Sequence, residues 1–222
     1  MSISPQSKLV LHYLALPNGI GGRGGALRFF LLSQDIPFEE KLFAMDGAWA
    51  AEKKRLSESG ENPSSKVPVV YVDDGKTALP EHIATGRLLA HVHGCASEDV
   101  YKNYVQDLVA DEYQGFRDTW VHQVFTATDE EKAAYKSEGL PKRLAQFDAL
   151  YASFKTHDIF LSISEKTKQP LWGDAACFGL LRDNIVTGKM DREELKKYKQ
   201  LDAMYTAFEK IPAVAKWIAS NK

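Results

Sequence analysis

The stretch most informative about the fold is KVPVVYVDDGKTALPEHIA, residues 66–84. Residues 67–72 are a short apolar run with a proline near its start, which predicts a strand at an edge or a bend of a sheet. Residues 73–76 read Asp-Asp-Gly-Lys, a hairpin turn signal, and residues 77–79 return as a second short strand. Pro80-Glu81 then opens a helix. The stretch therefore predicts an antiparallel hairpin followed by a helix.

The residues before this stretch predict a strand, a helix and a second strand. The apolar run 9–16 reads as a buried strand, residues 26–32 as a largely buried helix and residues 40–43 as a short strand. A further helical piece is expected at 48–56. Because a crossover helix joins parallel strands, these elements and the hairpin predict a four-stranded mixed sheet of the thioredoxin-like plan.

The residues after the hairpin predict helices alone. Helix starts are indicated by capping residues, a capping box or a first-turn proline at Ser97, Thr128, Pro141, Asp174, Asp191 and Pro212. Gly94-Cys95-Ala96-Ser97 reads as a linker. We therefore expect a thioredoxin-like α/β domain over residues 1–94 and an all-helical bundle over residues 98–222.

Composition excludes several classes of partner. The chain has 222 residues, of which 44% are hydrophobic and 26% charged, with a net charge of -2. No global basic field is available to recruit nucleic acid or anionic lipid. No run approaches the roughly 18 apolar residues of a membrane span, and the polar N-terminus does not resemble a signal peptide. Hence we expect neither a nucleic-acid nor a membrane partner.

The two cysteines indicate a reducing environment. Cys95 and Cys177 are far apart and form no Cys-x-x-Cys motif, so neither a disulfide framework nor a zinc ribbon is indicated. His91, His93 and Cys95 have metal-ligand side chains, but residues two apart on a helix do not share a face. We therefore expect a cytoplasmic protein without a metal site.

A glycine motif offers a competing interpretation. Gly19, Gly21 and Gly24 have the Gly-x-Gly-x-x-Gly spacing after a strand and before a helix, and Asp46 follows at about the distance a dinucleotide site needs. However, the loop from Tyr13 is long for the tight turn that such a site needs, and the rear half is helical. The other interpretation is a flexible, glycine-rich loop beside a site.

The motifs and their order resemble those of the cytosolic glutathione transferase superfamily. Within it they resemble the tyrosine-type enzymes, and the pattern is closest to that of the sigma-like classes. Residues 66–70, Asp74-Gly75 and 79–84 are similar to its glutathione-site signature. Similar features elsewhere are Tyr13, Gly22-Arg23, Arg28, the pair Trp49 and Lys53, Asp174 and the last helix from Ile211-Pro212. The resemblance covers essentially the whole chain and implies a glutathione-dependent enzyme.

The resemblance also implies roles for particular residues. Tyr13 would be catalytic, and Glu112 or Asp111 would reach the ligand of the partner in a homodimer. The glutathione-binding residues would be Arg23, Trp49, Lys53, Lys66, Val67, Pro68, Glu81, His82 and Glu112. Those lining a pocket for an apolar electrophile would be Tyr104, Tyr113, Arg117 and Trp120. Core packing is the alternative for each member of this second set. The implied role is detoxification, with glutathione as co-substrate and no metal.

The chemistry of the thiol supports the same function. A free thiol has a pKa of about 8.5, so a tyrosine hydroxyl that donates to the sulfur would favour the reactive thiolate. The start of the helix at Glu81 offers N–H groups to a carboxylate. A proline at position 68 could be cis and leave the backbone of Val67 free to pair with an extended peptide, or be an ordinary trans proline. A buried, structural Tyr13 is the alternative to a catalytic one.

The chain departs from the family pattern at several places, including a long stretch at residues 55–64, and two of the departures, the insertion and His82, leave a second function class open. Residues 17–20 are an apparent insertion near the expected thiol, and His82 replaces a small hydroxyl residue. Leu171 stands where the family has a Ser or Thr cap before Asp174. A non-catalytic binding or structural protein on the same fold is therefore the alternative to an enzyme.

Overall fold

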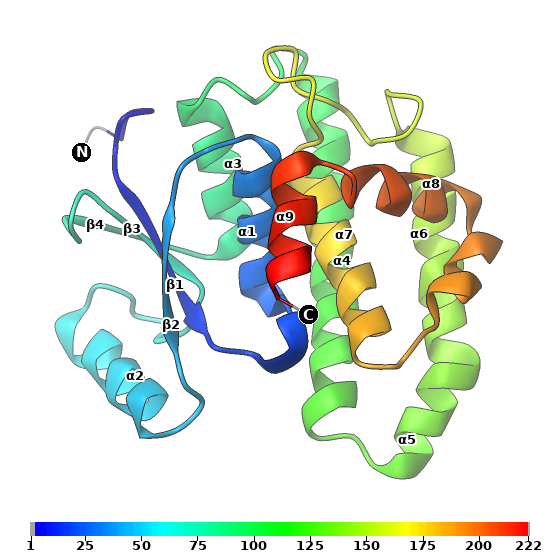
Figure 1. Cartoon of the computed structure of the whole chain (residues 1–222), viewed down its shortest axis with the longest axis horizontal. Coiled ribbons are helices and arrows are strands. Elements are labelled where there is room, and N and C mark those ends of the chain that lie inside the picture. The colour runs from blue at the N-terminus through cyan, green and yellow to red at the C-terminus, as the bar shows by residue number, and fades with distance from the viewer. Residues whose placement is uncertain (1–2, 222) are drawn as a thin grey trace.

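A four-stranded mixed sheet forms the front domain in the computed structural model, which describes residues 3–221 (Figure 1). The sheet order is β2-β1-β3-β4. Strands β1 (Leu9–Leu14) and β2 (Glu39–Phe43) are parallel, whereas β3 (Val69–Val72) is antiparallel to both β1 and β4 (Thr77–Pro80). The thioredoxin-like prediction is confirmed.

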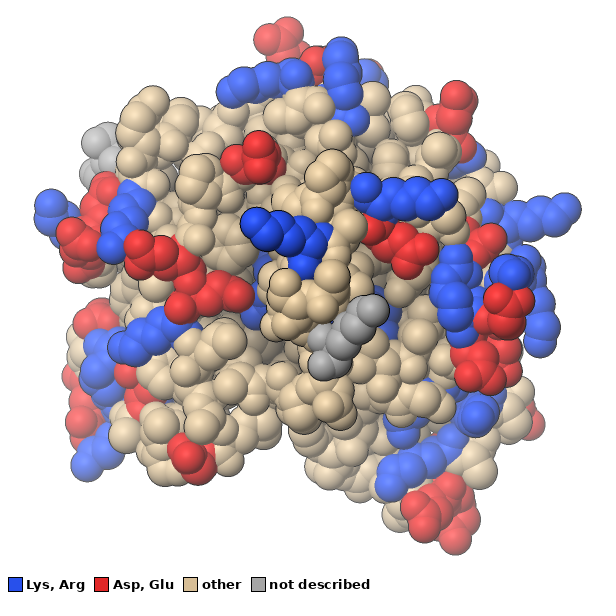
Figure 2. Space-filling model, in the orientation of Figure 1, with Lys and Arg blue, Asp and Glu red and all other residues tan. Residues whose placement is uncertain are grey.

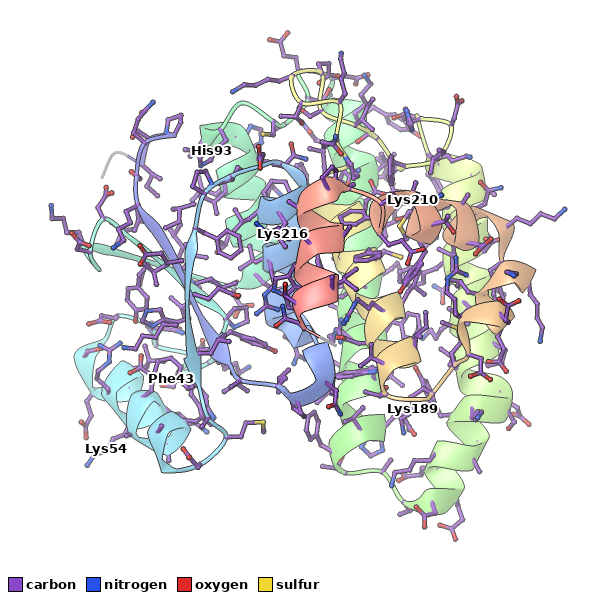
Figure 3. All side chains as sticks on the ribbon, in the orientation of Figure 1. Phe43, Lys54, His93, Lys189, Lys210 and Lys216 are labelled. Atoms are coloured by element: carbon purple, nitrogen blue, oxygen red, sulfur yellow. The ribbon has the colours of Figure 1, made fainter. Side chains whose placement is uncertain are left out.

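Three helices cover the two faces of this sheet. Helices α1 (Gly22–Ser33) and α3 (His82–Val92) pack with the main core, and α2 (Gly47–Ser59) covers the other face. The alternation of side chains along a strand divides them between these layers. On β1, Leu9 and Leu11 belong to the main core, and Val10 packs with the small cluster under α2. Phe43 lies between β2 and α2 (Figure 3).

The rear domain is helical. Its elements are α4 (Val100–Phe125), α5 (Asp129–Ala134), a π-helical turn (Tyr135–Gly139), α6 (Leu140–Phe154), α7 (Trp172–Val186), a 3-10 helix (Arg192–Lys197), α8 (Lys199–Phe208) and α9 (Pro212–Ser220). Helix α7 is buried almost throughout and packs against α1 and α4, so the apolar core runs from one domain into the other. The prediction of a helical rear domain is confirmed.

Several helix starts differ in detail from the prediction. The capping box of Thr128 and Glu131 is present. Asp99, not Ser97, caps α4 by accepting the Tyr101 N–H at 2.9 Å. Helix α7 begins at Trp172, and Asp174 lies fully buried in its first turn. The segment after Asp191 divides into a 3-10 helix and α8, where one helix was expected.

No helix within residues 3–221 has the length and apolar character to cross a lipid bilayer. Figure 2 shows Lys and Arg side chains interspersed with Asp and Glu around one face of the molecule. On that face the charges do not separate into a basic and an acidic half.

Candidate glutathione site

One cavity lies where the front and rear domains meet. It has a volume of about 410 Å³, within the range of roughly 300–1,000 Å³ that is usual for small-ligand sites. The surface in Figure 2 is notched at its lower edge, between the part that contains α2 and the part that contains α4 and α5. The residues lining the cavity are Leu14, Arg23, Trp49, Lys53, Ser64, Ser65, Lys66, Val67, Pro68, Glu81, His82 and Gln114.

This set contains most of the predicted glutathione-binding residues. The structure brings together Arg23 of α1, the α2 pair, the segment before β3 and the start of α3. Three of the lining side chains are cations and one is a carboxylate: Arg23, Lys53, Lys66 and Glu81. The cavity therefore suits a ligand that carries more negative than positive charge.

The α2 wall is positioned by a helix cap. Asp46 accepts the Ala48 N–H at 2.8 Å and starts the helix, which places Trp49 and Lys53 on one face four residues apart. The Trp49 ring packs at 6.4 Å from the ring of Phe43. Lys54, the next residue, instead lies on the outward side of α2 (Figure 3) and pairs with Glu58 at 3.8 Å. The two neighbouring lysines thus have different surroundings.

The wall before β3 has an unpaired backbone. The Val67–Pro68 peptide bond is cis, and β3 begins only at Val69, two residues later than predicted. Within residues 3–221 the backbone of Val67 makes no hydrogen bond, while the Lys66 carbonyl accepts one from Asn62 at 2.6 Å. An extended ligand can therefore pair with Val67 as an added strand would.

The start of α3 combines backbone strain with a buried histidine. Glu81 has φ of 65°, in the left-handed region that a non-glycine residue adopts at a cost of about 1–3 kcal/mol. His82 is 3% exposed, its Nε2 has no partner within residues 3–221, and its ring packs edge-on at 5.8 Å from Tyr113. Burial, helped by the cations Arg23 and Arg117, lowers the pKa of His82 to about 3. His82 is therefore neutral near pH 7.

Tyr13 borders the cavity but is not among the residues that line it. It is 6% exposed, and its hydroxyl oxygen accepts the Arg23 N–H at 2.9 Å. Burial raises the pKa of Tyr13, although the Arg117 cation acts in the opposite direction. The hydroxyl consequently keeps its proton near neutral pH. Leu14 and Arg23, on either side of this contact, do line the cavity.

The predicted co-substrate pocket is not formed by the residues assigned to it. Tyr113, Arg117 and Trp120 are at most 1% exposed and lie in the core, and Tyr104 is 50% exposed on α4 away from the cavity lining. This corrects the prediction. Their spacing on α4 places three of the four side chains on the buried side of the helix, and sequence periodicity cannot distinguish a pocket wall from a core.

Glu112 also lies outside the cavity lining, and its carboxylate accepts a hydrogen bond from Gln146 at 2.9 Å. Asp111, beside it, is exposed. Within one chain neither carboxylate reaches the site, and the prediction that one of them serves the partner's site in a dimer is not tested by a single chain.

Sequence reasoning missed five residues at the site. Leu14, Ser64, Ser65 and Gln114 line the cavity, and each lies within two residues of a residue that was predicted. Asp118, one helical turn beyond Gln114, forms an ion pair with Arg23 across the gap between α4 and α1. Adjacency to the predicted residues was the available signal for the first four. Nothing local in the sequence indicates the Arg23–Asp118 pair.

The dinucleotide interpretation fails at the start of α1. Both N–H groups that would hold a phosphate, those of Gly21 and Gly22, donate to the carboxylate of Asp183 at 2.7 and 2.8 Å. Asp46 is the cap of α2. The sheet order also differs from that of a Rossmann fold. Among residues 3–221, no three His, Cys, Asp or Glu side chains are grouped so as to hold a metal ion.

A mixed four-stranded sheet, a cis peptide before β3, a helical rear domain and a cavity between the domains define the class of glutathione-transferase-like proteins. Residues 114–221 match the family model for the C-terminal domain of glutathione S-transferases. This match covers most of the rear domain, and the fold of the whole chain is that of glutathione transferases.

Individual relatives are distant and come from several classes. Glutathione S-transferase Mu 3 of Homo sapiens is 23% identical over 227 residues, covering 99% of this chain and 92% of the relative. The pi-class glutathione S-transferase of Onchocerca volvulus has a TM-score of 0.78 at 20% identity, covering 96% and 93% of the two chains. Prostaglandin synthase D of Nilaparvata lugens shares the fold with a TM-score of 0.74 at 21% identity, covering 97% of this chain and 98% of that one. The sigma-class glutathione S-transferase of Fasciola hepatica has a TM-score of 0.75 at 20% identity, covering 97% of each chain.

Proposed function

We propose that this protein is a glutathione transferase that binds glutathione in the cavity between α1, α2, α3 and α4 and presents its thiol as the thiolate. The observation that carries the proposal is the composition of the cavity wall, where three cations, one carboxylate and an unpaired strand backbone converge. Glutathione is an extended tripeptide with two carboxylates and one ammonium group, so its charges and its backbone both match this wall.

Each end of the tripeptide has a complementary group. Lys53, beside the Trp49 ring, suits the glycine carboxylate, as in the sigma-like pattern that the sequence resembles. The first N–H groups of α3 suit the γ-glutamyl carboxylate, and the Glu81 side chain suits its ammonium group. The cysteinyl backbone pairs with Val67. His82 contributes a neutral ring where the family has a hydroxyl group.

Tyr13 is proposed to activate the thiol. Because its oxygen already accepts the Arg23 N–H, its own proton is free to be donated to sulfur. Such a bond stabilises the thiolate, which then forms an S–C bond with an electrophilic carbon as the leaving group departs with its electron pair. The Arg23 side chain, which lines the cavity, is the competing partner for sulfur.

The co-substrate is proposed to be smaller and more polar than the sequence suggested. Of the three aromatic residues expected to line its pocket, Tyr113 and Trp120 are in the core, and Tyr104 is exposed outside the cavity lining. The helix α4 instead presents Gln114 to the cavity, and Asp118 is paired with Arg23 at its edge. Polar and charged groups at this edge favour a compact polar electrophile over a bulky apolar one.

Isomerisation assisted by glutathione remains within the proposal, because one structural relative is a prostaglandin synthase. The alternative is a non-catalytic glutathione-binding protein. Thermal stabilisation by glutathione and turnover of a generic electrophile distinguish them. Binding and turnover support the transferase, binding with neither conjugation nor isomerisation supports the alternative, and no binding rejects both.

We also propose a homodimer, as the resemblance implies, in the reducing cytosol. The start of α4 exposes apolar side chains, with Val100 80%, Tyr101 49% and Tyr104 50% exposed. A second copy that covers this surface would remove its apolar area from water. Both cysteines are buried and free, consistent with a reducing compartment. Light scattering across a concentration series tests the dimer, and a monomer throughout contradicts it.

A further inference from the structure

A buried carboxylate holds the turn that contacts Tyr13. Asp183 on α7 is fully buried, and its two oxygens divide the donors between them. Oδ1 accepts the Gly21 N–H at 2.7 Å, whereas Oδ2 accepts the Gly22 N–H at 2.8 Å and pairs with Nη1 of the fully buried Arg117 at 2.6 Å. Burying a charge pair carries a large desolvation penalty, so packing alone does not explain why an ion pair holds this helix start.

The next residue of the same turn contacts the proposed catalytic hydroxyl. Gly21, Gly22 and Arg23 present three successive N–H groups, of which the first two bind Asp183 and the third donates to the Tyr13 hydroxyl oxygen at 2.9 Å. The carboxylate and the hydroxyl are thus held by one short piece of backbone. A movement of this turn relative to α7 would move the donor to Tyr13.

Tyr13 is closely packed against the backbone of Gly22 and Gly24. A Cβ at Gly22 would lie 2.3 Å from the Tyr13 hydroxyl oxygen, and one at Gly24 would lie 2.4 Å from its ring atom Cδ1. Gly22 also has φ of 55°, which favours glycine. The tyrosine therefore packs directly on glycine backbone, so the position of the turn determines the position of the ring and of its hydroxyl.

Arg117 allows Asp183 to act without imposing a negative charge on the site. Its guanidinium lies between the rings of Tyr113 and Trp120, at 5.4 and 4.8 Å, and its Nε donates to the Tyr113 hydroxyl at 3.2 Å. Beyond burial, Arg117 lowers and Asp183 raises the pKa of Tyr13, so the two charges oppose each other there.

We infer that Asp183, neutralised by Arg117, is a positioning residue that fixes the first turn of α1 so that the Arg23 N–H orients the Tyr13 hydroxyl toward the thiol. The inference rests on the proposed function. It assigns a purpose to the glycine-rich loop, whose motif resembles a phosphate-binding turn, and it connects α7 of the rear domain to the chemistry of the front domain.

The test is a double-mutant cycle between Asp183→Asn and Tyr13→Phe, measured as kcat/KM for glutathione conjugation. Asparagine keeps the size but has one acceptor oxygen where aspartate has two. We expect Asp183→Asn alone to lower kcat about tenfold, with less than a twofold change in glutathione Kd. In the Tyr13→Phe background it should cost less than twofold. Equal losses in both backgrounds would show that Asp183 is only structural.

Two further measurements keep the test decisive. If Asp183→Asn does not fold because Arg117 is left unpaired, the variant Arg117→Met/Asp183→Asn removes both charges and takes its place in the cycle. If the wild-type protein binds or turns over no glutathione, the proposed function fails, and amide hydrogen exchange then tests the positioning directly. Asp183→Asn should speed exchange at the Arg23 amide at least tenfold, and unchanged exchange would overturn the inference.

Discussion

Replacing Tyr13 with phenylalanine removes one hydroxyl group and leaves the ring packed on Gly22 and Gly24. In the wild-type protein that hydroxyl accepts the Arg23 N–H, and its proton is available to the thiol. Burial raises the pKa of Tyr13, so the group remains a donor across the usual assay range. The substitution therefore separates hydrogen bonding from packing.

The size of the effect follows from the bond that is lost. A hydrogen bond to a charged group is worth about 1.5–3 kcal/mol, and about 1.4 kcal/mol corresponds to a factor of ten. Turnover near pH 7 should therefore fall by roughly ten- to a hundredfold. Because the thiol ionises unaided at higher pH, the variant should regain part of its turnover above pH 8.5 or so, near the pKa of a free thiol.

The assay is the pH–rate profile of Tyr13→Phe beside that of Arg23→Ala, whose side chain is the competing partner for sulfur. Glutathione affinity should change little in the first variant, since Lys53, Val67 and Glu81 are proposed to hold most of the tripeptide. A profile unchanged in Tyr13→Phe and collapsed in Arg23→Ala would refute the catalytic role of the tyrosine.

The same variant carries a stability cost that the sequence did not predict. Phenylalanine leaves the half-buried Arg23 N–H without its acceptor, which costs about 1–3 kcal/mol when no water replaces it. For a chain of 222 residues each kcal/mol lowers Tm by about 2–4 °C. A small fall in Tm is thus expected along with the loss of turnover, and assays should be run well below it.

Three other variants test the site. Lys53→Ala should raise the Kd for glutathione about two- to fivefold, and this effect should shrink at high salt. Lys54→Ala, on the outward side of α2, should leave the Kd unchanged. Equal effects of the two substitutions in titrations would remove Lys53 from the site. His82 has a folded-state pKa of about 3 against 6.5 in the unfolded chain, so its contribution to stability is complete above pH 6.5 and is lost as the pH falls toward 3. In urea unfolding, the free energy of unfolding of the wild-type protein should therefore fall with decreasing pH between 6.5 and 3. His82→Asn should reduce the slope of that fall by up to about 1.4 kcal/mol per pH unit, and an unaltered slope would contradict the buried, neutral histidine. Asp118→Asn removes the ion-pair partner of Arg23 and should raise kcat/KM for a bulky aryl electrophile up to about fivefold at low salt, with little change for a small unsaturated aldehyde. The control Glu130→Ala should change neither value. An equal change for both electrophiles would reject a steric role for the Arg23–Asp118 pair.

The fold was predictable because its signals are local. The Asp73-Asp74-Gly75-Lys76 turn fixes the β3–β4 hairpin, and the Thr128 and Glu131 capping box starts α5. The prediction misplaced helix starts where a polar residue makes hydrogen bonds to distant segments of the chain. The sequence predicts Asp174 as a cap, but its side chain is buried and accepts hydrogen bonds from Gln106, Tyr151 and the Leu161 N–H.

The site was predictable only along its walls that are continuous in sequence. Trp49 and Lys53 are one helical turn apart, and residues 66–68 are consecutive, so their grouping follows from local structure. Asp183 and Gly21 are 162 residues apart, and Arg117 and Asp183 are 66 apart. No local pattern reports such pairs, which form only when α7 packs between α1 and α4. The same packing buries Tyr113 and Trp120, which the sequence assigned to a pocket.

Calorimetric titration of glutathione into the purified wild-type protein tests the central claim most directly. The cavity between α1, α2, α3 and α4 predicts one saturable site per chain, with a Kd between about 1 μM and 1 mM, as is usual for enzyme substrates. The same titration into Trp49→Ala/Lys53→Ala should show clearly weaker binding. No saturable heat at glutathione concentrations up to about tenfold above that range, or unchanged affinity in the double variant, would contradict the account.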